Sequence, residues 1–241
     1  MKEIDICIVS GSRPDLLNKT LLSFNENLLK YFRINKVFVN IDTIFGDEND
    51  RNICIKIIDS YFEESTINKT KNPSFGASVK WLWSNVSNNP FLHLEDDWLC
   101  LQKINPQFII NSLNKKTKSV SLLSYNHGKK GDNEFSSIYK KYKLFGFISR
   151  EKIIPHFNMS PSFFDGEFGK NCSDLMDPEL DPEKQFREGV NEELFKYAKK
   201  YKCKFLKSDT GEPIVKDIGR EWQKNNSINK FVSNGKSYWE I

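Results

Sequence analysis

The sequence predicts an α/β protein built on parallel strands with crossover helices, and three observations lead to this fold class. The chain opens with a β-branched run, Ile4–Val9, which is typical of a buried strand. A turn follows, and then leucines at helical spacing over 16–28, with Asp15 placed to cap that helix. A second apolar run, Val37–Asp42, ends on an acidic residue. This order of strand, helix and strand favours a parallel sheet with helical crossovers.

The rest of the chain carries weaker patterns of the same kinds. Ile53–Ile58 is a third apolar run. We expect helices over 77–86, 106–113, 151–156 and 191–201, and strands over 91–94, 120–125, 145–148 and 203–206. Residues 159–185 hold proline, glycine and aspartate with few periodic apolar positions, so we expect loops there. The tail beyond Asp217 is polar with isolated aromatics. Because no repeat or linker interrupts the chain, we expect one domain over 1–241.

The composition is that of a folded globular chain. Of the 241 residues, 38% are hydrophobic and 13% aromatic, whereas disordered chains have few aromatics and a large net charge. The net charge is +4, and the lysines are interleaved with acids instead of forming a basic track. We therefore expect no nucleic-acid partner, and the mildly basic balance fits an anionic small molecule.

The five cysteines and the lack of long apolar segments bear on the compartment. The cysteines are widely separated and none has CxxC spacing, which favours reduced thiols. Lys2, Glu3 and Asp5 interrupt any apolar region at the start, so we predict no signal peptide. No stretch approaches the ~20 apolar residues that cross a bilayer. We expect a soluble, cytoplasmic protein without a transmembrane segment, whose oligomeric state the sequence leaves open.

The strongest chemical signal is a cluster of three carboxylates, Glu95, Asp96 and Asp97, directly after the apolar strand 91–94. Packing three acids together costs repulsion and desolvation, so they make poor strand material. In an open α/β sheet, ligands bind at the carboxyl ends of the strands, where this cluster would lie. A divalent cation such as Mn²⁺ or Mg²⁺ bound to a diphosphate would relieve the repulsion. The alternative is a solvated acidic turn.

Two further segments are candidates for nucleotide contacts. The turn Ser10-Gly11-Ser12-Arg13 follows the first strand, where a glycine lets backbone amides approach a ligand and Arg13 can pair with a phosphate. It lacks both the GxGxxG and the GxxxxGK[ST] fingerprints, and an ordinary strand-to-helix turn is the alternative. Asp42 closes the second strand, where a carboxylate can accept hydrogen bonds from a base or ribose. Its alternative roles are helix capping and surface solvation.

Taken together, these residues resemble the GT-A glycosyltransferases. That family opens with a strand and a polar loop that embraces the nucleoside, matched here by 6–13, and places an acid after its second strand, matched by Asp42. A polar segment before the DxD strand is matched by 72–83, where Gly76 and Lys80 approach the donor. The DxD motif is matched by 95–97, with Glu95 at its first position. The resemblance implies a Rossmann-like twisted mixed sheet flanked by helices, with a nucleotide-sugar-binding half over 1–100 and an acceptor half over 101–241.

The resemblance also implies roles for single residues. Asp97 binds the metal directly and supports catalysis through it, Glu95 reaches the sugar or ribose, and Asp96 completes the donor site. Family members often supply a late histidine as a further metal ligand, but no histidine lies in the last third of this chain. Asp217 is the substitute candidate.

An acidic residue at the start of a helix deprotonates the acceptor in many inverting members of this family. Glu193, in the segment 191–194, occupies the comparable place, and a base must lie close to the acceptor oxygen. Asp165 and Asp181 are rival bases. Glutamate in a first helical turn is also routine capping chemistry.

The implied function is transfer of a sugar from a nucleoside diphosphate sugar to a hydroxyl acceptor such as a glycan, with UDP the commonest nucleotide in the family. Trp222, Tyr238 and Trp239 are candidates for stacking on sugar rings, or for covering the core. Alternatives are a sugar-phosphate nucleotidylyltransferase and a non-catalytic module that binds nucleotide or glycan. A metal-dependent nuclease is disfavoured because the sequence shows no basic groove.

Overall fold

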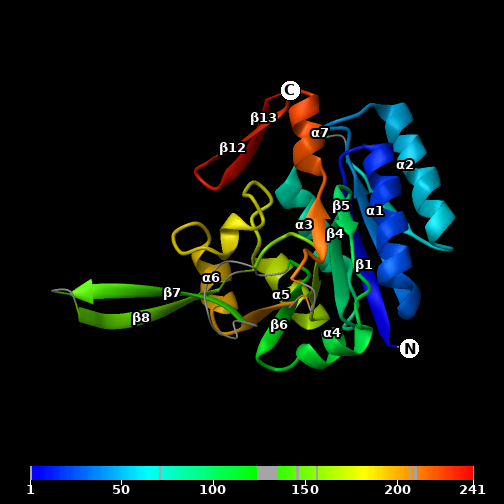
Figure 1. Ribbon diagram of the computed structural model, residues 1–241. Coiled ribbons are helices and arrows are strands. Elements are labelled where there is room, and N and C mark those ends of the chain that lie inside the picture. The colour runs from blue at the N-terminus through cyan, green and yellow to red at the C-terminus, as the bar shows by residue number, and fades with distance from the viewer. Residues whose placement is uncertain are drawn as a thin grey trace.

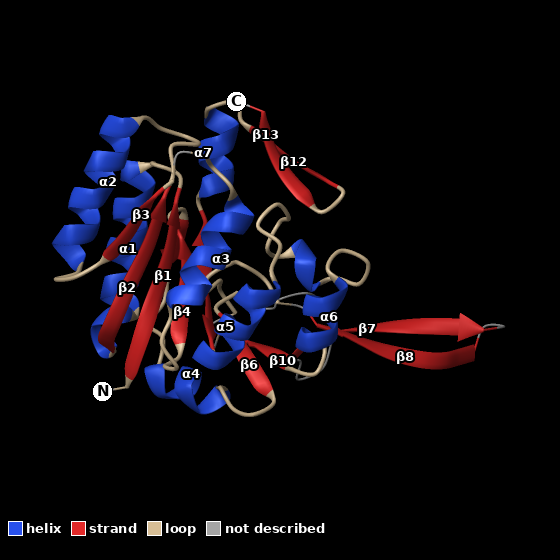
Figure 2. Cartoon of the chain, turned by 180° about the vertical axis from the view of Figure 1, so that it is seen from behind, coloured by secondary structure: helices blue, strands red, loops and turns tan. Residues whose placement is uncertain are grey.

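A mixed β-sheet runs through the molecule, with helices on both of its faces (Figures 1 and 2). The computed structural model of the chain describes residues 2–70, 72–123, 135–144, 147–155, 157–206, 208 and 211–240. In this part of the chain the strand order is β3-β2-β1-β4-β9-β6-β10-β7-β8. The strands are β1 (Glu3–Ser10), β2 (Arg33–Ile41), β3 (Thr66–Lys69), β4 (Phe91–Glu95), β6 (Thr117–Ser121), β7 (Phe135–Leu144), β8 (Phe147–Pro155), β9 (Ser162–Phe164) and β10 (Lys202–Phe205).

Helices and two small ribbons complete the described architecture. The helices are α1 (Pro14–Asn27), α2 (Glu48–Tyr61), α3 (Phe75–Asn85), α4 (Pro106–Ser112), α5 (Gly166–Leu175), α6 (Glu192–Ala198) and α7 (Gly219–Asn225), with 3₁₀ turns η1 (Leu29–Tyr31) and η2 (Lys184–Phe186). One ribbon pairs β5 (Trp98–Cys100) with β11 (Val215–Asp217), and the other pairs β12 (Asn229–Ser233) with β13 (Lys236–Glu240). Figure 1 shows β12 and β13 next to α7 at the end of the sheet opposite the N-terminus, whereas β7 and β8 extend away from the other elements.

The first half of the sheet is parallel and the second half is mixed. β2 pairs with β1 and β3, and β1 with β4, all in parallel. β9 then lies antiparallel between β4 and β6, and β10 runs parallel to β6. Because β1, β2 and β4 point the same way, their carboxyl ends meet at one edge of the sheet, where ligands of open α/β sheets bind.

Strand β1 explains why the first apolar run is unbroken. Its residues Ile4, Ile6 and Ile8 pack into one cluster with α1 and α2, whereas Cys7 packs into a second cluster with α3 and α5. In Figure 1 α1 lies in front of the sheet, and in Figure 2, seen from behind, α3 does. A strand covered on both faces needs apolar residues at consecutive positions. The twisted mixed sheet with helices on both faces is thus confirmed.

Trp83 anchors the second cluster beneath β4. It is fully buried and its ring lies 5.4 Å from that of Phe91 and 4.5 Å from that of Phe164, measured between centroids. Its Nε1 donates a hydrogen bond of 3.2 Å to Nδ1 of His93. Burial lowers the pKa of His93 to about 3. The imidazole is therefore neutral at physiological pH, and its Nδ1 can accept the hydrogen bond from the indole N–H.

Several expected elements are present with shifted ends. The helices expected over 77–86, 106–113 and 191–201 are α3, α4 and α6, and the strand expected over 203–206 is β10. The strand expected over 120–125 is β6, which ends at Ser121, and residues 124 and 125 lie outside the described part. Residues 145 and 146 of another expected strand also lie outside it, and 147–148 begin β8. The apolar run Ile53–Ile58 lies within α2.

Two expectations were wrong, and the tail contains elements that were not predicted. Residues 151–155 belong to β8 and are not helical, because they pair with β7; His156 lies outside the described residues. The supposed loops over 159–185 contain β9 and α5, and the tail beyond Asp217 contains α7 and the β12–β13 hairpin. The glycines that made α5 look like a loop are packing residues. A Cβ at Gly166 would overlap backbone oxygens of 87 and 89, and one at Gly169 would overlap the ring of Phe91.

All five cysteines are buried free thiols. Among the helices that the structure describes, none has both the length and the apolar character needed to span a bilayer.

The Trp83–His93 hydrogen bond gives a stability prediction. Trp83→Phe leaves His93 Nδ1 buried without its donor and removes ring volume, so we expect unfolding free energy to fall by about 1–3 kcal/mol. The matched control is Trp81→Phe on the same helix, where the ring is only partly buried and the expected loss is below about 1 kcal/mol. Urea denaturation of both variants measures the difference, and equal losses would contradict this account of the core.

Candidate functional site

Three strand ends come together at the carboxyl edge of the parallel half-sheet. Val9 pairs with Glu95 across β1 and β4, and the backbone N–H of Asp96 donates to the carbonyl of Val9 at 3.0 Å. On the other side of β1, the N–H of Asp42 donates to the carbonyl of Ser10 at 3.0 Å. The sheet register therefore places the acidic cluster, the loop after β1 and the acid after β2 next to one another.

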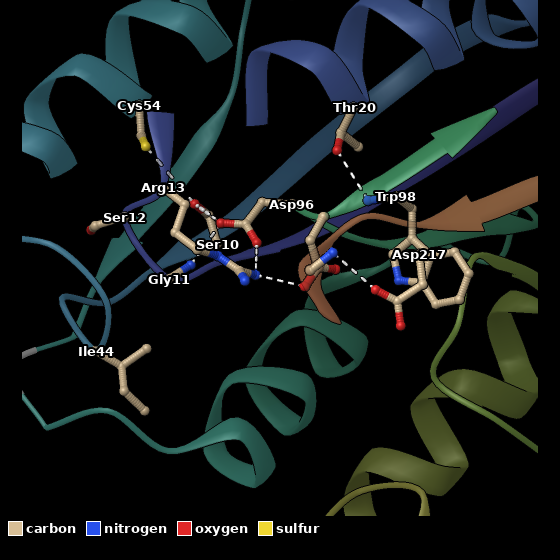
Figure 3. Close-up of polar contacts among 12 residues, drawn as sticks. Ser10, Gly11, Ser12, Arg13, Thr20, Ile44, Cys54, Asp96, Trp98 and Asp217 are labelled. Carbon is tan, nitrogen blue, oxygen red and sulfur yellow. Dashed lines mark hydrogen bonds and ion pairs between the residues drawn. The ribbon is translucent and has the colours of Figure 1, made fainter. Parts of the chain in front are cut away.

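Arg13 is the cation at the centre of this edge (Figure 3). Its Nη2 forms ion pairs with Oδ1 of Asp96 and, at 2.9 Å, with Oδ2 of Asp97. The other oxygen of Asp96 accepts hydrogen bonds from Ser10 Oγ at 2.8 Å and from the N–H of Gly11 at 2.9 Å. Arg13 is only 7% exposed. Two of the three neighbouring carboxylates are thus compensated by a buried guanidinium from the same chain.

The loop after β1 reaches this position through an unusual backbone conformation. Ser12 has a φ of 59°, in the left-handed region that non-glycine residues seldom adopt. Its hydroxyl donates to the carbonyl of Asp42 at 2.5 Å, which ties the loop to the end of β2. Gly11 lies against Phe45, and a Cβ at this position would come within 2.6 Å of the ring. The loop therefore packs as a fixed unit between Asp96 and Phe45.

Aromatic rings enclose the guanidinium. The Cζ of Arg13 lies 4.8 Å from the ring centroid of Phe45 and 5.2 Å from that of Trp222, both within the range of cation–π attraction. Trp239 of β13 packs edge-on against Phe45, with 4.9 Å between centroids. Within the described structure, the buried Nε and Nη1 of Arg13 have no hydrogen-bond partner. Burial alone would lower the pKa of Arg13, but Asp96 and Asp97 raise it above its usual value.

A cavity of about 260 Å³ opens beside these residues. Its volume lies just below the range of about 300–1,000 Å³ typical of small-molecule sites. It is lined by charged residues of both signs, namely Arg13, Asp42, Glu95, Asp96, Asp97, Asp217, Arg220 and Lys230. Its aromatic walls are Phe45, Phe75, Trp98 and Trp239. The lining comes from both parts of the chain, 1–100 and 101–241, because α7 and the β12–β13 hairpin close one side.

The carboxylates of the cavity are held in an unfavourable environment. Burial raises the pKa of Asp97 to about 6, although Arg13 acts in the opposite direction. Burial also raises the pKa of Glu95 well above its usual value, and the charge of Asp97 adds to this, whereas Lys230 lowers it. Burial raises the pKa of Asp42 to about 6 against a hydrogen bond from the N–H of Ile44. Asp97 and Asp42 are thus poised to change protonation near pH 6, as is common at functional sites.

The residues expected to bind a metal line this cavity, but two of the three, Asp97 and Asp217, are engaged in other contacts. Asp217 Oδ1 accepts from the N–H groups of Gly219 and Arg220, and its Oδ2 accepts from Arg220 Nε at 2.9 Å. Asp97 is paired with Arg13. Among the described residues, no three His, Cys, Asp or Glu side chains are arranged to hold a metal ion. In this arrangement the donor set does not fit a divalent cation, because a guanidinium already compensates the acids.

Two of the expected donor-binding residues support a loop instead of lining the cavity. Lys80 Nζ donates to the carbonyl of Met176 at 2.6 Å. A Cβ on Gly76 would overlap the backbone carbonyls of Pro178 and Leu180. Lys80 thus ties the segment 176–180 to α3 by a hydrogen bond, and Gly76 lets that segment approach the helix closely.

The three candidate bases occupy different environments. Asp165 caps α5 through the N–H of Phe168 and pairs with Lys118 at 3.0 Å. Asp181 is buried and accepts from Ser237 Oγ at 2.5 Å. Glu193 is exposed in the first turn of α6 and does not line the cavity. The structure therefore does not bring Glu193 into the cavity formed by Arg13 and the acids.

Several cavity residues were not singled out from the sequence. Phe45, Gln223 and Lys230 line the cavity from segments without a recognisable chemical motif, and Phe75 does so from the segment 72–83, in which only Gly76 and Lys80 were singled out. The local signal that could have identified Phe45 is the position of a large aromatic residue directly before Gly46 in the loop after Asp42.

No protein-family model matches the chain, and no curated protein matches its sequence. Solved structures do match its fold. TarS of S. aureus is 12% identical over 87% of this chain and 36% of its own, with a TM-score of 0.55; its residues 1–349 are known in complex with UDP-GlcNAc. The mannosyltransferase PcManGT of Pyrobaculum calidifontis, in complex with GDP-Man and Mn²⁺, is 10% identical over 86% of this chain and 56% of its own, with a TM-score of 0.56.

The chain thus spans only about a third to three fifths of these transferases. A CMP:2-keto-3-deoxy-manno-octonic acid synthetase complexed with CTP is matched over 94% of this chain and 98% of its own, with 10% identity and a TM-score of 0.51. At such identities the likeness concerns the fold alone. The chain therefore has the fold of the GT-A nucleotide-sugar glycosyltransferases.

Proposed function

We propose that the protein transfers a sugar from a nucleoside diphosphate sugar to a hydroxyl group of a glycan or a similar acceptor. The observation that carries the proposal is the cavity at the carboxyl edge of β1, β2 and β4, where Arg13, Asp42 and the acidic cluster converge between aromatic walls. This is the edge at which nucleotides bind in open α/β sheets.

Each group in the cavity has a matching part of the donor. Arg13 and Arg220 supply positive charge for the diphosphate, and stabilising it as it departs lowers the barrier to transfer. Asp42 accepts a hydrogen bond from the ribose or base. The rings of Phe45 and Trp239 provide apolar faces for a base or sugar. UDP is the proposed nucleotide on the strength of the family resemblance alone.

The site geometry does not support the expected requirement for Mn²⁺ or Mg²⁺. Asp97, Glu95 and Asp217 are the oxygen ligands on offer, and Asp97 is paired with Arg13. The roles proposed for Arg13, Asp42 and Arg220 do not depend on a divalent ion.

Glu193 is the proposed base for the acceptor hydroxyl. The support is the resemblance to inverting GT-A members, in which an acidic residue at the start of a comparable helix deprotonates the acceptor. Glu193 is exposed in the first turn of α6 and does not line the cavity beside Arg13. The rival carboxylates Asp165 and Asp181 are engaged in other contacts.

A sugar-phosphate nucleotidylyltransferase is the second candidate, because a synthetase complexed with CTP matches the fold over nearly its whole length. Against it stands the loop 10–13, which lacks the longer glycine-rich signature and following lysine expected of that class.

The two candidates release different products. We expect that at least one nucleotide sugar raises the melting temperature of the protein and that nucleoside diphosphate is released when acceptors are added. Thermal-shift screening of a nucleotide-sugar panel, with Mn²⁺ and separately with EDTA, followed by product analysis, checks this. Release of pyrophosphate from a nucleoside triphosphate would favour the nucleotidylyltransferase, and no response to any nucleotide sugar would refute the proposal.

The neighbouring glutamates of α6 form a matched pair for testing the base. Glu193→Gln removes the proposed proton acceptor, so we expect turnover to fall by about 100-fold or more with donor affinity unchanged. In Glu192→Gln, turnover should stay within about threefold, because Glu192 Oε1 only accepts the N–H of Gly189 at 2.9 Å. Equal activity of the two variants would remove Glu193 from the mechanism.

The raised pKa of Asp42 predicts a pH-dependent effect of Asp42→Asn on stability. The folded protein holds this proton up to about pH 6, whereas an unfolded chain releases it near pH 4. The wild-type carboxylate therefore costs stability as the pH rises from 4 to 6. We therefore expect the difference in unfolding free energy between Asp42→Asn and wild type to shift in favour of the variant by on the order of 2 kcal/mol between pH 4 and pH 7.

Denaturation curves at the two pH values measure this difference. Asp59→Asn, at an exposed position of α2, controls for the substitution itself. If the effect of Asp42→Asn is the same at both pH values, the carboxylate is not held in a desolvated position.

A further inference from the structure

Arg13 has more hydrogen-bonding capacity than its protein partners use. Its Nη2 holds Asp96 and Asp97, whereas Nε and Nη1 are buried without a partner in the described structure. Unpartnered buried donors are rare in folded proteins and call for an explanation. The side chain lines the cavity and is 93% buried, since its exposed fraction is 7%. An oxyanion that enters the cavity therefore lies beside a guanidinium with two unused donors, which it reaches once the rings of Phe45 and Trp222 shift.

A second cation, Lys230, lies near the cluster, so two cations face its three carboxylates. Lys230 of β12 lines the same cavity and lowers the pKa of Glu95, and it lies 5.3 Å from the ring centroid of Phe75 and 5.3 Å from that of Trp239. Its Nζ is 3.6 Å from Asp181 Oδ2. The β12–β13 hairpin thus brings a positive charge to the carboxylate that Arg13 leaves unpaired.

We propose that Arg13 is the resident cation of this site, so that the protein binds the diphosphate of its nucleotide without a divalent ion. The inference rests on the proposed function. Nη2 keeps Asp96 and Asp97 compensated, and the remaining N–H groups of the guanidinium are donors for phosphate oxygens. A planar guanidinium suits this task because its donors are fixed in direction and it keeps its charge when buried.

The loop after β1 and two aromatic rings hold Arg13 in place beside the acids. Gly11 and the left-handed Ser12 direct the loop so that Arg13 follows immediately beside Asp96. The rings of Phe45 and Trp222 hold the guanidinium from its sides. A divalent ion between Asp96 and Asp97 would have to displace Arg13 into these rings, against attraction from both acids.

The first part of the test uses metal alone and does not depend on any nucleotide. Binding of Mn²⁺ is followed by loss of the free-ion electron paramagnetic resonance signal. We expect at least tenfold tighter Mn²⁺ binding by Arg13→Gln than by wild type, because the variant leaves the acids uncompensated. Equal binding by the two proteins would overturn the proposal.

The second part compares nucleotide-sugar affinity in Mn²⁺ and in EDTA. We expect wild-type dissociation constants within about threefold of one another. Binding that requires Mn²⁺ would overturn the resident-cation proposal and leave the proposed function standing. Absence of binding under both conditions would overturn both, while the metal-only measurement still reports whether Arg13 excludes the ion.

Arg13→Lys keeps the experiment informative if Arg13→Gln does not fold. Lysine retains the positive charge but has a single nitrogen, so we expect a folded protein whose affinity in EDTA falls at least tenfold. Unchanged affinity would indicate that Arg13 only balances charge and does not bind phosphate, which contradicts the proposal. The matched control is Arg33→Lys, at an exposed side chain that pairs with Glu3, where no change is expected.

Discussion

The rest of the site depends on the ion pairs between Arg13 and two adjacent carboxylates, Asp96 and Asp97. Without a cation, three consecutive acids at the end of a buried strand would repel one another in a poorly solvated place. The guanidinium reduces that cost, and Ser10 and Gly11 take up the oxygen of Asp96 that faces away from it. Even so, the pKa of Asp97 stays raised to about 6 by burial. Burial therefore still disfavours the ionised form of Asp97, even with the guanidinium beside it.

The architecture of the sheet makes these contacts possible. Parallel pairing of β1 with β4 aligns Val9 with Glu95, so a loop and a cluster separated by more than 80 residues in the sequence meet at one edge. The chain then returns: β11 pairs with β5 directly after the cluster, and Gly219 at the start of α7 leaves room for the Asp97 carboxylate, which a Cβ there would overlap. The late segments of the chain therefore finish a cavity that the early segments begin.

The parts of this arrangement that could be predicted from the sequence are those with local causes. The apolar run of β1 and the acids after β4 can be recognised without knowing what they contact. Because ligands of open α/β sheets bind at the carboxyl ends of the strands, the place of the acidic cluster then follows. The partner of Arg13 had no such signal, because an ion pair across the sheet depends on register. Gly166 and Gly169 suggested a loop since their role, close packing against β4, exists only in the fold. Residues 151–155 of β8 were expected to be helical because their pairing with β7 is likewise a tertiary property.

The central claim is that the cation facing the diphosphate is a side chain of the protein. The most direct measurement is a crystal structure with a nucleotide sugar bound in the presence of chelator. The account predicts diphosphate oxygens within hydrogen-bond distance of the Arg13 guanidinium, with Asp96 and Asp97 still paired to it. A nucleotide bound elsewhere, or one that appears only with a metal ion held by Asp97 and with Arg13 turned away, would contradict it.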